Sequence, residues 1–237
     1  MTKTDGTDAL KNLAVALEDS TRESVAQLLK QPASNALAVA IAEAPTSLME
    51  ETTRELEEVL PGPEPMACRK GCPTCCHVPV RTDAQSVIRI VEHVRQSWPV
   101  VERIKLKTRI DAHVEATKDD YAFAAVADRP ACPFLVEDSC SVHAVRPMVC
   151  RAFNSTDLAA CLKAAKMVGG FASIPAYAMP NMVTVAVQKG MIAALKEKGY
   201  GDQSLDFMPA VQYALSVPDA GERWLKSKRF YPEDAEE

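Results

Sequence analysis

The sequence has no run of apolar residues long enough to span a membrane. Its first residues also lack the apolar segment of a secretory signal, so we expect a cytoplasmic protein without membrane contact. Acidic residues outnumber basic ones, 32 to 27, which leaves no broad basic surface and disfavours nucleic-acid binding. A phosphate-binding loop, a dinucleotide fingerprint and a serine–histidine–acid pattern are missing as well. These absences exclude the commonest nucleotide-dependent and hydrolytic enzyme classes.

Cysteine is confined to one part of the chain. All eight cysteines fall within ninety-four positions, at Cys68, Cys72, Cys75, Cys76, Cys132, Cys140, Cys150 and Cys161. In a reducing cytoplasm, a dense cysteine cluster indicates metal binding or catalysis rather than disulfide bonds. A chain of 237 residues can bury a core without a metal or disulfide staple. We therefore predict a metal site that is carried by the fold and is not a folding device.

The adjacent pair Cys75 and Cys76 is the difficult feature of this cluster. Thiolates favour Zn²⁺, Cu⁺ and iron–sulfur clusters, and the Cys72-x-x-Cys75 spacing suits one ion or one cluster edge. Neighbouring side chains diverge, so both members of the pair seldom bind one ion. One of them faces elsewhere, or there are two metals, or the site is a multinuclear cluster. The pair and the surplus of thiols favour an iron–sulfur cluster over zinc.

Cys161 is the weakest of the eight candidate ligands. It follows an N-terminal cap at Asn154–Asp157 and lies among alanines on a predicted helix. A lone cysteine in such a place is often a small buried apolar residue. We expect its replacement to lower metal content less than replacement of Cys72 or Cys150.

Charged and imidazole side chains flank the cysteines. Arg146 and Arg151 are candidate cofactor-binding residues, because cations beside metal-bound thiolates offset their charge. An ordinary surface role is the alternative for both. His77 and His143 could be ligands or proton carriers, although a structural role is the commoner one for such histidines.

Apolar periodicity predicts an all-α, irregular helical fold with the cysteine site carried on loops. A capping box at Ser20–Glu23 suggests two short helices rather than one over 10–29, and Pro45 is expected to break a second helical region over 34–60. Residues 128–153 are expected to be mostly loop, and Pro180 to precede a helix. The later helices are expected at about 82–98, 100–116, 119–127, a segment around Cys161, 181–198, 207–216 and 219–227.

The proline-rich segment Pro61–Pro65 is the clearest break in the chain, because three prolines and a glycine cannot continue a helix. We expect an N-terminal helical region at 1–61 and a cysteine-cluster domain with C-terminal helices at 62–237, its core at 66–161. The N-terminal helices could pack on the rest of the chain or mediate self-association.

Three segments together resemble a known family. They are Cys68-x₃-Cys-x₂-Cys-Cys76, Cys132-Pro-Phe-Leu, and Cys140-Ser-x₄-Arg-Pro-x₂-Cys-Arg151. This pattern is similar to that of the YkgJ-type cysteine-cluster family, also called the CxxCxxCC family or zinc- or iron-chelating domain. His143 departs from it, since members often have an aromatic residue there. The resemblance implies metal chelation, with seven of the cysteines, Arg146 and Arg151 matching family positions. One branch resembles flagellin lysine N-methylases, but no S-adenosylmethionine pocket is recognisable in this sequence.

Three functions follow from these patterns. The favoured one is a protein that holds an iron–sulfur cluster or zinc. The alternatives are an iron–sulfur-dependent enzyme of redox or methyl transfer, and a metal store or chaperone.

Overall fold

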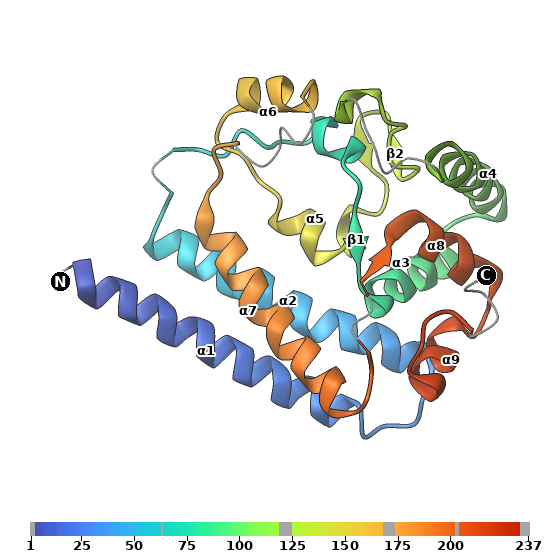
Figure 1. Cartoon of the computed structure of the whole chain (residues 1–237), viewed down its shortest axis with the longest axis horizontal. Helices are drawn as coiled ribbons and strands as arrows, with labels where there is room; N and C mark the ends of the chain where they lie inside the picture. The colour runs from blue at the N-terminus through green and yellow to red at the C-terminus, as the bar shows by residue number, and fades with distance from the viewer. Residues whose placement is uncertain (1–2, 63, 119–124, 168–173, 202–203, 233–237) are drawn as a thin grey trace. The chain divides into compact units, whose positions relative to one another are not determined.

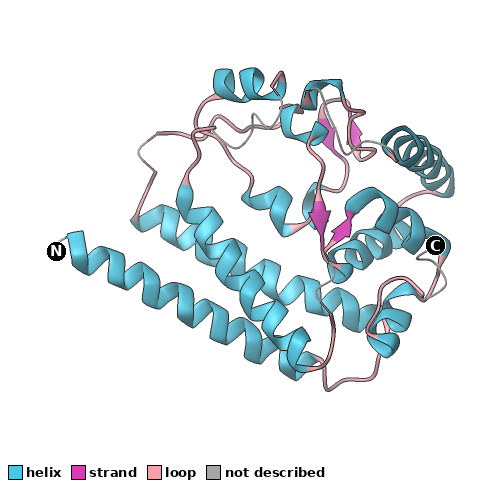
Figure 2. Cartoon of the chain, viewed as in Figure 1, coloured by secondary structure: helices cyan, strands magenta, loops and turns pink. Residues whose placement is uncertain are grey.

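The computed structural model describes residues 3–62, 64–118, 125–167, 174–201 and 204–232. Helices dominate these ranges, and their strands form only two small antiparallel pairs (Figure 2), which confirms the all-α prediction. The helices are α1 Lys3–Leu28, α2 Asn35–Val59, α3 Ala84–Ser97, α4 Val100–Thr117, α5 Met148–Ala152, α6 Leu158–Ala165, α7 Ala178–Glu197, α8 Phe207–Ser216 and α9 Ala220–Ser227 (Figure 1). Of the described helices, none is long and apolar enough to cross a membrane.

The chain divides into two compact units. The first comprises residues 1–61, 178–204 and 219–237, and the second comprises 62–177 and 205–218. The change of unit after Pro61 falls within the proline-rich break, while two C-terminal segments group with the N-terminal helices. The second unit contains all eight cysteines. The division into domains at 1–61 and 62–237 stays a prediction.

In the first unit, α1 is one helix and not two. Leu17, Thr21 and Val25 are spaced four residues apart and are all buried, so a continuous stripe crosses the segment of the Ser20 capping box. Burial of this stripe outweighs the local capping signal, because most helical stability in proteins comes from tertiary packing.

The expected break at Pro45 is wrong. α2 runs through it, with Pro45 buried in the same stripe as Leu37, Ile41 and Met49. A proline inside a helix costs about 3 kcal/mol, and burial of a side chain in this stripe offsets much of that cost. Thr46 does not cap a new helix, since its hydroxyl donates to the Ala42 carbonyl at 2.7 Å.

α7 packs against α1 with almost no space between the backbones. A Cβ atom on Gly190 would lie 2.1 Å from the Glu18 carbonyl oxygen, so only glycine fits there. α7 begins at Ala178, which places Pro180 in its first turn rather than in the preceding loop; the missing N–H is tolerated at that end. As expected, Gly199 ends α7, with a φ of +82°.

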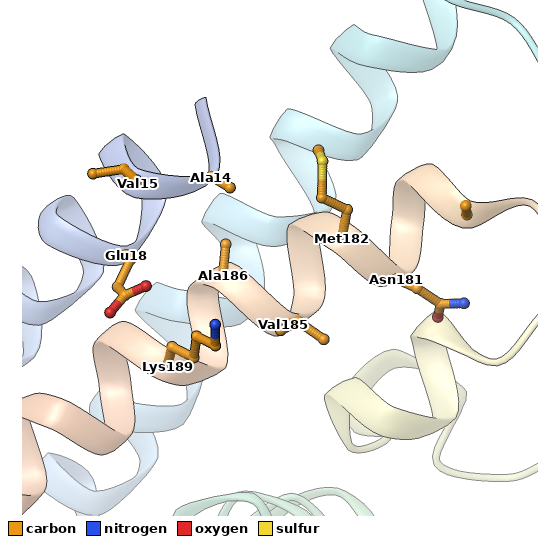
Figure 3. Close-up of a pocket in the computed structure, with 9 residues that line it drawn as sticks. Ala14, Val15, Glu18, Asn181, Met182, Val185, Ala186 and Lys189 are labelled. Atoms are coloured by element: carbon orange, nitrogen blue, oxygen red, sulfur yellow. The ribbon is translucent and has the colours of Figure 1, made fainter. Parts of the chain in front are cut away.

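Residues of α1 and α7 line a pocket (Figure 3). Its lining includes Ala14, Val15 and Glu18 from α1 and Met182, Val185 and Lys189 from α7. Self-association through the N-terminal helices stays a prediction.

In the second unit, α8 packs on α3 and α4. The buried side chains include Val91 on α3, Ile110 on α4 and Val211 on α8. Arg95 holds the end of α8, because its guanidinium donates to the carbonyls of Ala214 at 2.7 Å and Pro218 at 3.0 Å. The strands β1 (Arg81–Thr82) and β4 (Leu205–Asp206) pair antiparallel beside this helical layer.

The segment 128–153 has more structure than expected. Strands β2 (Leu135–Val136) and β3 (Ser139–Cys140) form a hairpin whose turn residues Glu137 and Asp138 both have positive φ, as a tight two-residue turn requires. Phe134 packs on Phe207 with 5.9 Å between ring centroids. The 3₁₀ helix η3 (His143–Val145) and α5 follow. Aromatic packing and the hairpin thus order a segment that the local sequence predicted to be mostly loop. Of the helix expected at 119–127, residues 119–124 lie outside the described residues, and a 3₁₀ helix, η2, covers Val126–Asp128.

Candidate metal centre

The first cysteine group lies on a tight loop and a short 3₁₀ helix, η1 (Thr74–His77). Gly71 has a φ of +84°, which turns the chain between Cys68 and Cys72. Cys68 is exposed, whereas Cys72, Cys75 and Cys76 are partly buried. The two adjacent cysteines both lie on η1, where successive side chains leave the backbone in different directions.

Backbone contacts tie Cys68 to the start of α6. The Ser155 carbonyl accepts a hydrogen bond from the Ala67 N–H at 2.9 Å and a weaker one from the Cys68 thiol at 3.9 Å. α6 carries Cys161, which is buried, and the helix packs on η1. Burial raises the pKa of the Cys68 thiol, and the charges of Cys75, Cys72 and Cys161 raise it further. Cys161 is therefore a neighbour of the first group, a role that its sequence surroundings did not favour.

Cys132, Cys140 and Cys150 lie on segments other than α6. The Cys132 N–H donates to the Cys76 carbonyl at 2.8 Å. Cys140 pairs with Leu135 across the hairpin, and Cys150 lies on α5. Chiefly through burial, the pKa values of Cys132 and Cys150 are raised to about 12. The charges of Cys150, Cys140 and Cys75 add to the shift at Cys132, and those of Cys75 and Cys140 add to the shift at Cys150. These three thiols form a second neighbourhood.

Cys75 interacts with thiols of both neighbourhoods. Its pKa is raised first by a side-chain hydrogen bond with Cys76 and then by burial. Its charge in turn raises the pKa values of four other thiols, which belong to both neighbourhoods: Cys68, Cys132, Cys140 and Cys150.

The two arginines have different surroundings. Arg151 donates from Nε to the Arg146 carbonyl at 3.0 Å, and from Nη2 to the Ala144 carbonyl. It therefore braces the turn that carries Arg146. The Arg146 Nε is buried and has no hydrogen-bond partner among the described residues, while its charge lowers the pKa values of Cys75, Cys140 and Cys150. A buried unpaired donor beside thiols suits an anionic metal–thiolate group.

The histidines next to the cysteines differ as well. The His77 Nδ1 lies 2.8 Å from the Arg129 carbonyl; because a carbonyl only accepts, Nδ1 is the donor of this bond. This bond joins η1 to the segment before Cys132. His143 is exposed at the start of η3.

The donor set fits a soft metal better than a hard one, since thiols are the most numerous possible ligands near η1. Among the described residues, no three cysteine, histidine or acidic side chains are already arranged as a metal-ligand group.

Two residues near the thiols were not predicted from the sequence. Ser155 contributes through its backbone carbonyl, which any residue possesses. The Thr74 hydroxyl lies 3.8 Å from the Cys72 sulfur, and its place inside the Cys72-x-x-Cys75 loop was the only available indication.

Comparison with known proteins gives one match, and it coincides with the cysteine region. Residues 67–168 match the model of the CxxCxxCC family, whose description is a putative zinc- or iron-chelating domain. Searches of curated proteins and of solved structures found no match. The matched range includes all eight cysteines, Arg146 and Arg151. The match covers less than half of the chain, and over residues 67–168 the chain is similar to the CxxCxxCC family.

Proposed function

We propose that this chain is a metal-binding protein that holds an iron–sulfur cluster, in preference to zinc, through the thiols gathered around η1. The observation that carries the proposal is that cysteine-bearing segments meet at η1. α6, which carries Cys161, packs on η1, and the Cys132 N–H donates to the Cys76 carbonyl at 2.8 Å. The family match supports metal chelation in general.

The preference for an iron–sulfur cluster rests on the number of thiols. One zinc ion takes four ligands, and this region supplies twice as many thiolates. A bound cluster would supply electron transfer, whereas zinc would supply a fixed charge without redox chemistry. The chain's own residues would act as ligands through their thiolates, with Arg146 offsetting the negative charge.

Anaerobic purification followed by analysis of iron, zinc and acid-labile sulfide tests the proposal. We expect a brown protein with iron and sulfide in similar amounts, and a lower content of both in Cys72→Ser and in Cys150→Ser. A colourless protein with stoichiometric zinc and no sulfide would refute the cluster and retain metal binding. A wild-type protein that holds neither metal, and takes up neither on reconstitution, would refute the whole proposal.

A further inference from the structure

Residues 129–132, the segment that ends in Cys132, have neither helix nor strand structure of their own. They lie between η2 and the β2–β3 hairpin. Pro130 lacks a backbone N–H, so this short segment offers its neighbours chiefly carbonyl groups. The position of Cys132 therefore depends on the bonds that other elements make to these carbonyls and to the Cys132 N–H.

η1 holds the segment at two points. The His77 Nδ1 donates to the Arg129 carbonyl at 2.8 Å, and the Cys132 N–H donates to the Cys76 carbonyl at 2.8 Å. Two consecutive residues of η1 thus bind residues that stand three apart in the segment. One bond alone would let the segment pivot, whereas two bonds at separate points fix its direction.

Other elements of the second unit approach the same segment. η1 packs on η2, which ends directly before Arg129. His113 of α4 is partly buried, and its ring interacts with the backbone of Ala131. The segment is therefore held from several sides, and His77 supplies the side-chain bond nearest to the 68–76 loop.

We infer that His77 is a positioning residue of the candidate metal centre: its imidazole holds residues 129–132 against η1 and so keeps Cys132 beside the 68–76 loop. It acts through Cys132 and requires no bond to a metal. The consequence for metal binding rests on the proposed function, whereas the hydrogen bond itself exists without a metal. A histidine that binds a metal through Nε2 commonly also donates from its other ring nitrogen to a carbonyl, so the test has to separate the two roles.

Substitutions that keep or move the donor separate them. An asparagine amide nitrogen can replace Nδ1 of the ring, whereas a glutamine amide nitrogen lies nearer to the place of Nε2. We expect His77→Asn to bind Co²⁺ like wild type in titrations of the full-length, reduced apoprotein. His77→Ala and His77→Gln should bind it about 10–100-fold more weakly. His93→Ala is the matched control, because His93 is another partly buried histidine of the second unit, on α3.

Alkylation of the metal-free protein reports on Cys132 directly. The reduced apoprotein is treated briefly with iodoacetamide, and the modification of each cysteine is measured by mass spectrometry. Loss of one hydrogen bond should raise the alkylation rate of Cys132 about 2–10-fold in His77→Ala. The rate at Cys161, which lies on α6, should not change. His77→Asn should restore the wild-type rate at Cys132.

Far-ultraviolet circular dichroism checks the fold of each variant, and His77→Gln replaces His77→Ala in both measurements if the alanine variant does not fold. An unchanged alkylation rate at Cys132 in these variants would overturn the inference. So would Co²⁺ affinity that glutamine restores and asparagine does not, since His77 would then be a ligand through Nε2. A wild-type protein that binds no Co²⁺, zinc or iron would instead refute the proposed function, and the alkylation rates would still decide whether His77 holds Cys132.

Discussion

Replacement of Gly190 by alanine should destabilise the first unit. The added Cβ would lie 2.1 Å from the Glu18 carbonyl oxygen, 2.9 Å from the Thr21 Cβ and 3.0 Å from the Arg22 nitrogen. The first distance is about 1.3 Å shorter than the 3.4 Å at which ordinary van der Waals contact begins. Two of the three neighbours are backbone atoms, which cannot rotate away, so α1 and α7 have to move apart.

The size of the effect follows from two opposing terms. Overpacking of a core costs about 1–3 kcal/mol, and the backbone contact places Gly190→Ala at the upper end. Alanine is favoured over glycine within a helix by about 1 kcal/mol, which leaves a net loss of about 2 kcal/mol in the free energy of unfolding. For a chain of this size that corresponds to a fall in Tm of about 4–8 °C.

Thermal and urea unfolding followed by circular dichroism measure this loss. Gly201→Ala is the matched control, because its Cβ would have no atom within 4 Å; we expect a change of at most about 0.5 kcal/mol. Metal content per folded chain should not change, since the first unit contains no cysteine. A Gly190→Ala protein as stable as wild type would show that α1 and α7 are not in this close contact.

Three further predictions concern the cysteine domain. Arg146→Gln should weaken metal binding about 10–100-fold, as measured by competition with a chromophoric chelator. The control Lys70→Gln, at an exposed position, should bind metal like wild type. Equal metal affinities for the two variants would show that Arg146 does not contribute to the site. Metal affinity should rise with pH between about 6 and 9, because the raised pKa values of Cys132 and Cys150, about 12 each, keep both thiols protonated until a metal displaces the protons. The protons released on metal binding can be measured in weak buffer. Metal binding without proton release would contradict the prediction. Metal removal by a chelator should leave the helical circular dichroism signal largely intact, and its collapse would show that the metal is needed for folding.

Helical periodicity predicted most of the fold because burial in this chain follows simple spacing. The buried residues of α7 include Val183, Val187 and Met191, which stand four residues apart in the sequence. Pro45 and the Ser20 capping box misled the local prediction for one reason: each is a signal of backbone preference, and the buried stripe around it outweighs that preference.

The sequence predicted less of the site than of the fold. Spacing predicts that the Cys68–Cys76 loop is a metal-binding segment, since four thiols so close together are typical of metal and cluster ligands when cysteines are kept reduced. It says nothing of which thiols become neighbours after folding. Cys161 illustrates the limit, because its alanine-rich helix resembles a core position, and its closeness to Cys68 depends on the packing of α6 against η1.

The long interval between the two halves of the cysteine pattern requires the fold to form before the site. Roughly 55 residues separate Cys76 from Cys132, and closing a flexible loop of that length costs about 3.5 kcal/mol through its length-dependent term. Here α3 and α4 occupy the interval, and their burial against α8 offsets this cost without any thiol. Phe134 then packs on Phe207, and the Cys132 N–H reaches the Cys76 carbonyl. We therefore expect a bound metal to meet thiols that the apolar core has already brought near η1, so that its binding requires release of their protons but not closure of the loop.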